Sequence, residues 1–112
     1  GLRVGLVGFK DAELPEPLEG RDVEVARGRA LRDCALLLVA VTGPADLERL
    51  PAWRQAIRRD GGIWTVYRKG VKAFGENDVR AAARQHGLVD VKVAAWSATH
   101  SALKLVIPKA ER

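Results

Sequence analysis

The stretch from Cys34 to Tyr67 most constrains what this chain can fold into. An apolar run at residues 35–41 is followed by a segment with helical spacing and then by a second apolar run at residues 63–67. The first run shows no alternation of polar and apolar side chains, so both of its faces should be buried. A strand, a helix and a second strand of this length form a βαβ unit, whose crossover is nearly always right-handed. The stretch therefore predicts the centre of a parallel sheet.

The segment between the two runs predicts helix over residues 45–59, with an interruption. Pro51 stands inside the helical pattern, where its ring removes a hydrogen bond and clashes with the preceding turn. We therefore expect one helix to end near Arg49 and a second to restart at Pro51. The Gly61-Gly62 pair that follows is expected to supply a left-handed stop.

The remaining segments predict further strands and one more helix. Two short apolar strands are expected at residues 2–7 and 22–25, a helix at residues 76–86, and alternating strands at residues 88–96 and 101–107. The last two strands are joined by a connection that is too short for a parallel crossover, so they should form an antiparallel hairpin. Residues 8–20, with two prolines, predict an extended surface loop, and residues 27–32 a single helical turn.

Size and composition limit the architecture. With 112 residues the chain has room for one domain, residues 1–112, and no apolar run is long enough to span a bilayer. It has no signal-peptide pattern, and it begins with Gly, so we expect a cytosolic protein whose numbering lacks some N-terminal residues. The single Cys34 is expected to be a small core residue. The absence of Met and the scarcity of Asn and Gln favour a thermophilic source.

Positive charge is concentrated in one part of the chain. The net charge is +5, and residues 54–84 alone carry 8 basic and 3 acidic side chains, whereas the balance before residue 54 is negative. A local excess of this kind indicates an anionic partner better than a uniform one does. Three of these cations, Arg68, Lys69 and Lys72, follow a predicted strand, on the side where open α/β sheets place ligands. They are the candidate anion-binding residues; a solvated charged surface is the alternative.

Four segments resemble the class I S-adenosylmethionine-dependent methyltransferases. Residues 33–39 resemble the fourth strand of that fold, residues 56–64 the glycine-glycine turn before its fifth strand, and residues 87–93 and 101–104 its closing hairpin. The resemblance implies a Rossmann-like α/β fold: an open, mostly parallel sheet that ends in an antiparallel hairpin, a truncated methyltransferase-like sheet of order 2-1-3-4-6-5. The "LVDVKV" and "SALK" strands and Tyr67-Arg68-Lys69 also resemble a bacterial family of short proteins of unestablished function.

The residues that would carry methyltransferase chemistry are sparse. The turn after the first strand holds one glycine, Gly8, rather than a Gly-rich pattern, and Glu24 is the only acidic candidate for a ribose partner on the second strand. His86 is expected at a helix end and His100 in a hairpin turn, with no triad geometry and no metal-ligand spacing. We therefore assign no catalytic residue, no metal site and no cofactor, and consider the cofactor-binding residues unknown.

Three functions remain open from the sequence. The first is a non-catalytic binding or assembly module on a degenerate methyltransferase-like fold, forming a homodimer through the final hairpin or the face that carries Trp96. The second is a reduced S-adenosylmethionine-dependent methyltransferase completed by a partner chain. The third is an anion or nucleic-acid binding module that uses the basic loop 68–72. A ligand beside Gly8 and Thr42, at the carboxyl edge of the sheet, would separate them.

Overall fold

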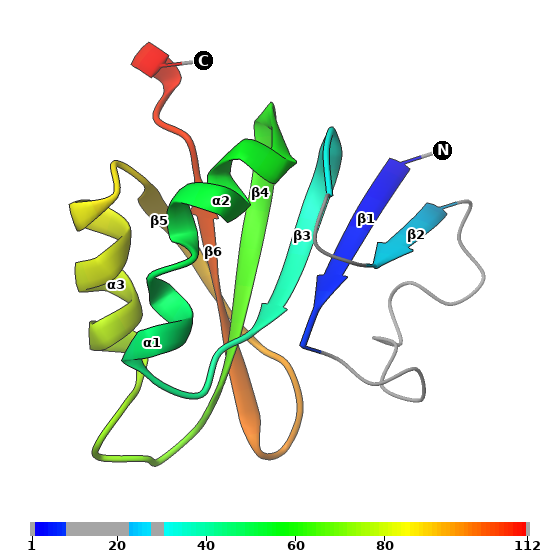
Figure 1. Cartoon of the computed structure of the whole chain (residues 1–112). Coiled ribbons are helices and arrows are strands. Elements are labelled where there is room, and N and C mark those ends of the chain that lie inside the picture. The colour runs from blue at the N-terminus through cyan, green and yellow to red at the C-terminus, as the bar shows by residue number, and fades with distance from the viewer. Residues whose placement is uncertain (1, 9–22, 28–30, 112) are drawn as a thin grey trace.

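In the described part of the chain, one six-stranded sheet organises the protein, and helices α1, α2 and α3 lie on one of its faces (Figure 1). The computed structural model describes residues 2–8, 23–27 and 31–111. The strand order is β2-β1-β3-β4-β6-β5, as the methyltransferase resemblance implies, so the predicted fold class is confirmed. The strands are β1 (Leu2–Val7), β2 (Val23–Arg27), β3 (Cys34–Ala40), β4 (Ile57–Arg68), β5 (Val89–Ala95) and β6 (His100–Val106).

The sheet changes direction at its final hairpin. β2, β1, β3 and β4 run parallel to one another, whereas β6 pairs antiparallel with β4 and β5 antiparallel with β6. The short connection after β5 enforces this reversal, as expected. The carboxyl end of β4 consequently lies beside the start of β6, with Arg68 opposite His100.

The helical segment before β4 is shorter than its sequence pattern predicts. It forms α1 (Pro44–Leu47) and α2 (Leu50–Ala56), which confirms the interruption, but Ile57 already begins β4. The prediction of helix to residue 59 is therefore wrong. Ile57 pairs with Cys34 on β3 and Gly62 pairs with Leu36, so residues 58–61 bulge opposite one residue of β3.

The Gly61-Gly62 pair serves close approach rather than a left-handed turn. Neither glycine has a positive φ. A Cβ built on Gly61 would lie 2.9 Å from the carbonyl oxygen of Cys34, and one on Gly62 would lie 2.6 Å from Cε of Lys104. The pair is needed because the bulge presses the β4 backbone against β3, and because the side chain of Lys104 crosses it. The predicted left-handed stop is wrong for this reason.

Helix α3 (Glu76–Gln85) begins and ends where the sequence predicts. The carboxylate of Asp78 accepts a hydrogen bond of 2.8 Å from the backbone N–H of Gly75. At the other end, Gly87 has φ +73, and Leu88 N–H donates to Ala83 O while Gly87 N–H donates to Arg84 O. This pair of bonds is the Schellman arrangement that glycine favours. His86 is the C-cap residue, as expected.

The core has two unequal parts. The larger cluster lies between the sheet and the helices and includes Cys34, Trp53 and Leu103, which confirms Cys34 as a core residue. The smaller cluster contains Val4, Leu6 and Leu38, with half-buried Leu36, Trp64 and Trp96 packed against it. No described helix contributes to the smaller cluster. Trp64 therefore belongs to the smaller cluster and not to the main core.

A polar network fixes α3 to the sheet. Tyr67 Oη donates to Glu76 Oε1 at 3.3 Å, and Glu76 Oε2 pairs with Arg80 Nη1 at 3.4 Å. Arg80 Nε lies 3.3 Å from Asp90 Oδ2 on β5, an ion-pair distance without hydrogen-bond alignment. Burial, followed by the charge and hydrogen bond of Glu76, raises the pKa of Tyr67 above 10.0.

Two predictions lie outside the described residues, namely the extended loop at 8–20 beyond Gly8 and most of the turn at 27–32. None of the helices in the described ranges has the length and apolar character needed to cross a membrane.

Candidate functional site

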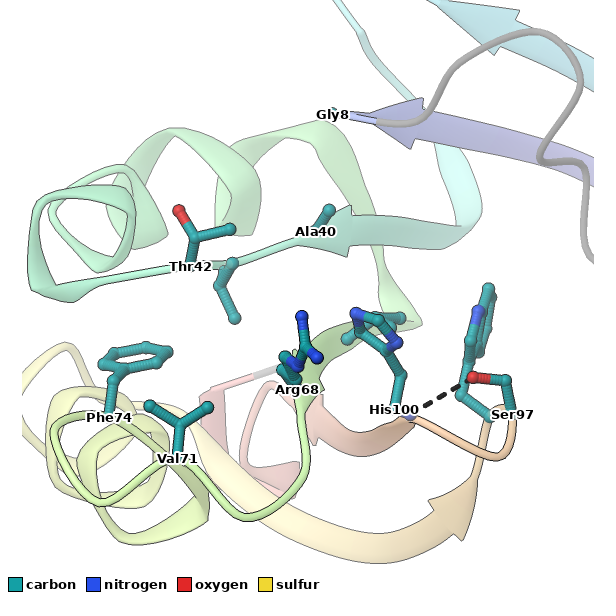
Figure 2. A pocket seen from close by; sticks show the side chains of 11 residues that line it. Gly8, Ala40, Thr42, Arg68, Val71, Phe74, Ser97 and His100 are labelled. Atoms are coloured by element: carbon teal, nitrogen blue, oxygen red, sulfur yellow. Dashed lines mark hydrogen bonds between the residues drawn. The ribbon is translucent and has the colours of Figure 1, made fainter.

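A pocket of about 460 Å³ opens at the carboxyl edge of the parallel strands (Figure 2). The ends of β1, β3 and β4 form its floor, and the loop before α3 and the β5–β6 turn form its walls. Its lining residues are Gly8, Ala40, Val41, Thr42, Val66, Arg68, Val71, Phe74, Trp96, Ser97 and His100. This is the edge, beside Gly8 and Thr42, at which a ligand would separate the three functions that the sequence leaves open.

Arg68 and His100 are two of the polar side chains that line the pocket, beside Thr42 and Ser97. Figure 2 shows both side chains rising from neighbouring strands into the same space. His100 Nδ1 lies 2.7 Å from Thr99 Oγ1, and its backbone N–H donates to Ser97 Oγ at 3.1 Å. These bonds fix the ring, so its other nitrogen is the one left for a ligand. The guanidinium of Arg68 is exposed, and no carboxylate in the described part of the chain pairs with it.

Lys69 stabilises the wall of the pocket instead of facing it. Its ammonium Nζ donates to the carbonyl of Ser97 at 3.1 Å, and its backbone N–H donates to Thr99 O at 2.9 Å. Both bonds join the end of β4 to the β5–β6 turn, which carries His100. Lys72 is exposed in the loop before α3 and does not line the pocket. Of the three candidate anion-binding residues, Arg68 alone reaches the cavity, and the site that the three define stays a prediction.

The wider group of cations does not form one surface. Arg58 and Arg59 are exposed at the start of β4, at the sheet edge opposite to Arg68. Arg54 is bound by the backbone oxygens of His86 and Gly87. These side chains are close in the sequence but not in space, because β4 runs through the middle of the basic stretch and separates its two ends. The excess charge is thus divided between two edges of the sheet.

None of the described residues that line the pocket is an Asp or Glu. The carboxylate of Asp46, on α1, accepts hydrogen bonds from the N–H of the lining residue Thr42 at 2.8 Å and from Thr42 Oγ1 at 3.0 Å. In the described residues, no three His, Cys, Asp or Glu side chains gather as metal ligands do. The chemistry that the pocket offers is cationic and hydrogen-bonding over an apolar surface.

Glu24 does not occupy the position considered for it from the sequence. It pairs with Arg3 as the second residue of β2, near the start of both strands and away from the carboxyl edge. Gly8, in contrast, does lie at that edge with φ +81, and a Cβ there would lie 3.2 Å from Ala40 Cβ. The backbone therefore comes close to β3 at this point, as only glycine allows without strain.

Sequence reasoning missed His100 as a pocket residue because it treated the hairpin turn by itself. The signal was present in the predicted topology. An antiparallel β6 returns to the carboxyl edge of β4, so the residue that opens β6 must lie near the residue that ends β4. The register confirms this, since Arg68 lies opposite His100 and Tyr67 opposite Ser101.

Comparison with solved structures shows the fold. The chain is similar to a TehB-like SAM-dependent methyltransferase from Corynebacterium glutamicum, with a TM-score of 0.68 and 14% identity over 96% of this chain and 81% of the other. It is also similar to a ribosomal protein L11 methylase from Lactobacillus delbrueckii subsp. bulgaricus, with a TM-score of 0.60 and 10% identity over 95% and 70%. The chain is similar as well to the B. subtilis tRNA methyltransferase TrmK. The TM-score is 0.64 and the identity 11%, over 96% of this chain and 61% of the other.

These likenesses establish a class I methyltransferase-like sheet and nothing finer, since the identities are low. No family model matches the chain. No curated protein matches it either.

Proposed function

We propose that this protein is a binding module that holds a small anionic ligand in the pocket at the carboxyl edge of its methyltransferase-like sheet. The observation that carries the proposal is the exposed guanidinium of Arg68 in a cavity whose described lining residues include no Asp or Glu. A cation at the mouth of a concave site, with no carboxylate partner in the described part of the chain, favours a carboxylate or phosphate ligand.

The lining also indicates the rest of the ligand. Val71 and Phe74 on one wall, and Trp96 on the other, offer apolar and aromatic surface. The free nitrogen of His100 can exchange a hydrogen bond with a neighbouring polar group. A ligand with an anionic group and a flat or apolar body would satisfy both kinds of surface, as small-molecule sites generally require.

The residues that line the pocket support a role in binding and not in catalysis. A general acid or base near Arg68 is limited to His100 among the lining residues, and the turn at Gly8 has no Gly-rich continuation in the sequence. We expect S-adenosylmethionine not to bind measurably to the isolated chain. Membership of the short bacterial family that the sequence resembles likewise stays a prediction.

Calorimetric titration with inorganic phosphate, a nucleoside monophosphate and S-adenosylmethionine tests the proposal. Arg68→Gln should lower anion affinity roughly tenfold or more, since a hydrogen bond to a charged group contributes about 1.5–3 kcal/mol. Arg58→Gln is the matched control, because it removes the same charge from the opposite end of β4. Equal losses in both variants, or no anion binding by the parent at low salt, would refute the pocket as an anion site.

Two alternatives have distinct outcomes in the same titrations. Micromolar affinity for S-adenosylmethionine would favour a reduced methyltransferase completed by a partner chain, which the shared fold supports. Binding of nucleic acid that requires loop 68–72 would favour the third function. Because Lys69 holds the β5–β6 turn, that test should combine Arg68→Ala with Lys72→Ala and leave Lys69 in place.

A further inference from the structure

The sheet face opposite α1–α3, which none of the described helices covers and which is called here the open face, carries a row of cationic and aromatic side chains. Trp64 on β4 lies opposite Lys104 on β6, and Lys104 lies opposite Lys92 on β5. Residues directly opposite on antiparallel strands project from the same face, so Trp64, Lys104 and Lys92 form one row. We propose that this row, together with Trp96, binds single-stranded nucleic acid.

The two lysines of the row, Lys92 and Lys104, place like charges opposite each other on neighbouring strands. Like charges directly opposite each other on neighbouring strands destabilise a sheet. None of the described carboxylates lies within ion-pair distance of either lysine. A chain of phosphates would neutralise both, and the counterions released from it would favour binding.

The aromatic rings decide between a nucleic acid and another polyanion. Trp64 and Trp96 are each only partly buried, and both pack against the smaller cluster on this face. Lys104 Nζ lies 5.9 Å from the centroid of the Trp64 ring, which makes it a cation–π partner. A flexible lysine can turn toward a phosphate and leave the ring to a base, and base stacking on aromatic rings is the common feature of single-strand sites. An acidic peptide would use the lysines without needing the rings.

The row continues toward the pocket edge. Arg68 projects from the same face as Trp64, four positions along β4, which is about 13 Å at roughly 3.3 Å per residue. That length suits a strand of a few nucleotides. The inference does not depend on the proposed function, because a nucleic acid could bind the row when the pocket is empty.

Fluorescence anisotropy of a labelled oligothymidylate over a series of salt concentrations tests the lysines. The double variant Lys92→Gln/Lys104→Gln should weaken binding and reduce the slope of log affinity against log salt by about 1.4, since each phosphate contact on a single strand contributes about 0.7. The matched control is Arg58→Gln/Arg59→Gln, which removes the same charge from exposed residues at the far end of β4. Equal weakening in both double variants would show general charge attraction and overturn the inference, as would the absence of binding by the parent at low salt.

A second measurement tests the rings. Unlabelled oligothymidylate should quench the tryptophan emission of the parent, and Trp64→Leu should weaken binding roughly fivefold or more. If Trp64→Leu does not fold, the quenching of the parent decides, since Trp53 is buried on the helix side and cannot be reached. Absence of quenching, or competition by polyglutamate as strong as that by the oligonucleotide, would overturn the inference.

Discussion

Tyr67 connects burial to pH at the scale of one residue. Its hydroxyl donates to Glu76 inside a partly desolvated network, and its pKa is raised above 10.0 for that reason. A group whose pKa is higher in the folded state binds its proton more tightly there than in the unfolded chain. The stabilisation is therefore complete below the unfolded value and is lost as the pH rises through the folded one.

We predict that the free energy of unfolding falls as the pH rises above about 10, and that Tyr67→Phe reduces this fall. Because Tyr67 is the only tyrosine, ultraviolet absorbance of the phenolate follows its ionisation directly. The denatured protein in the same buffers supplies the reference. A phenolate transition at the same pH in folded and denatured protein would contradict the prediction.

Arg54 shows how a cation from the basic stretch can have a structural role. Its side chain, 28% exposed, donates to the backbone oxygens of His86 and Gly87 at 3.3 and 3.4 Å and pairs with Glu111 at 2.7 Å. These contacts join α2 to the end of α3 and to the short helix Lys109–Glu111. The side chain accepts solvent on one side, so the contribution should be modest.

Arg54→Ala should lower the free energy of unfolding by about 1 kcal/mol. Arg58→Ala, at an exposed position with no bonded partner among the described residues, should change it by less than about 0.5 kcal/mol. Chemical denaturation of the two variants beside the parent checks the difference. Equal effects of the two substitutions would show that the contacts of Arg54 with the end of α3 do not contribute to the free energy of unfolding.

At the scale of elements, the start of β4 shows what local sequence could not predict. The spacing of apolar residues up to Ile57 is helical, and Arg58 and Arg59 are good helix formers, so local propensity favoured one more turn. The observed strand instead obtains its stability from pairing with β3, which lies far away in the sequence. Tertiary pairing overrides a weak propensity, and no local pattern reports it.

The bulge at residues 58–61 requires a residue without a Cβ at position 61, because the backbone of β3 lies too close. Gly61→Ala would bring Cβ to 2.9 Å from Cys34 O and 3.0 Å from Ala35 O, both backbone atoms that cannot move independently. We predict a loss of about 1–3 kcal/mol in the free energy of unfolding. Gly43→Ala is the control, because its φ is extended and nothing lies within 4 Å of a Cβ there. If both variants have the same thermal midpoint, the close approach is not as tight as described.

At the scale of the molecule, the strand order could be predicted and the pocket only in part. Apolar runs and the short final connection determine which segments become strands, and the order follows from the resemblance. The pocket depends on the register that places His100 opposite Arg68 and on the bonds of Lys69 to the β5–β6 turn. Such contacts between distant segments leave no periodicity in the sequence. The edge could therefore be predicted, but not the full set of side chains that meet there.

The edge strand β5 exposes apolar side chains that bear on the assembly of the protein. Val89, Val91 and Val93 are 42%, 54% and 45% exposed on a strand that has a neighbour on one side only. Exposed apolar edges invite pairing with another chain unless a device protects them. We predict a homodimer formed through this hairpin edge, which would leave the open face accessible. β5 pairs with β6 on both sides of a register shift between Asp90 and Lys92, so Val91 lies at the bulge of this edge strand.

Light scattering at micromolar concentration should therefore give twice the chain mass, and Val91→Lys should shift the protein to the monomer by placing a charge on the edge. Val71→Lys is the control, since Val71 is exposed to a similar extent, 41%, but lies in the loop before α3. A monomer mass for the parent would contradict the prediction. The bulge beside Val91 would then be the feature that keeps the edge from pairing, because bulges twist edge strands away from incoming partners.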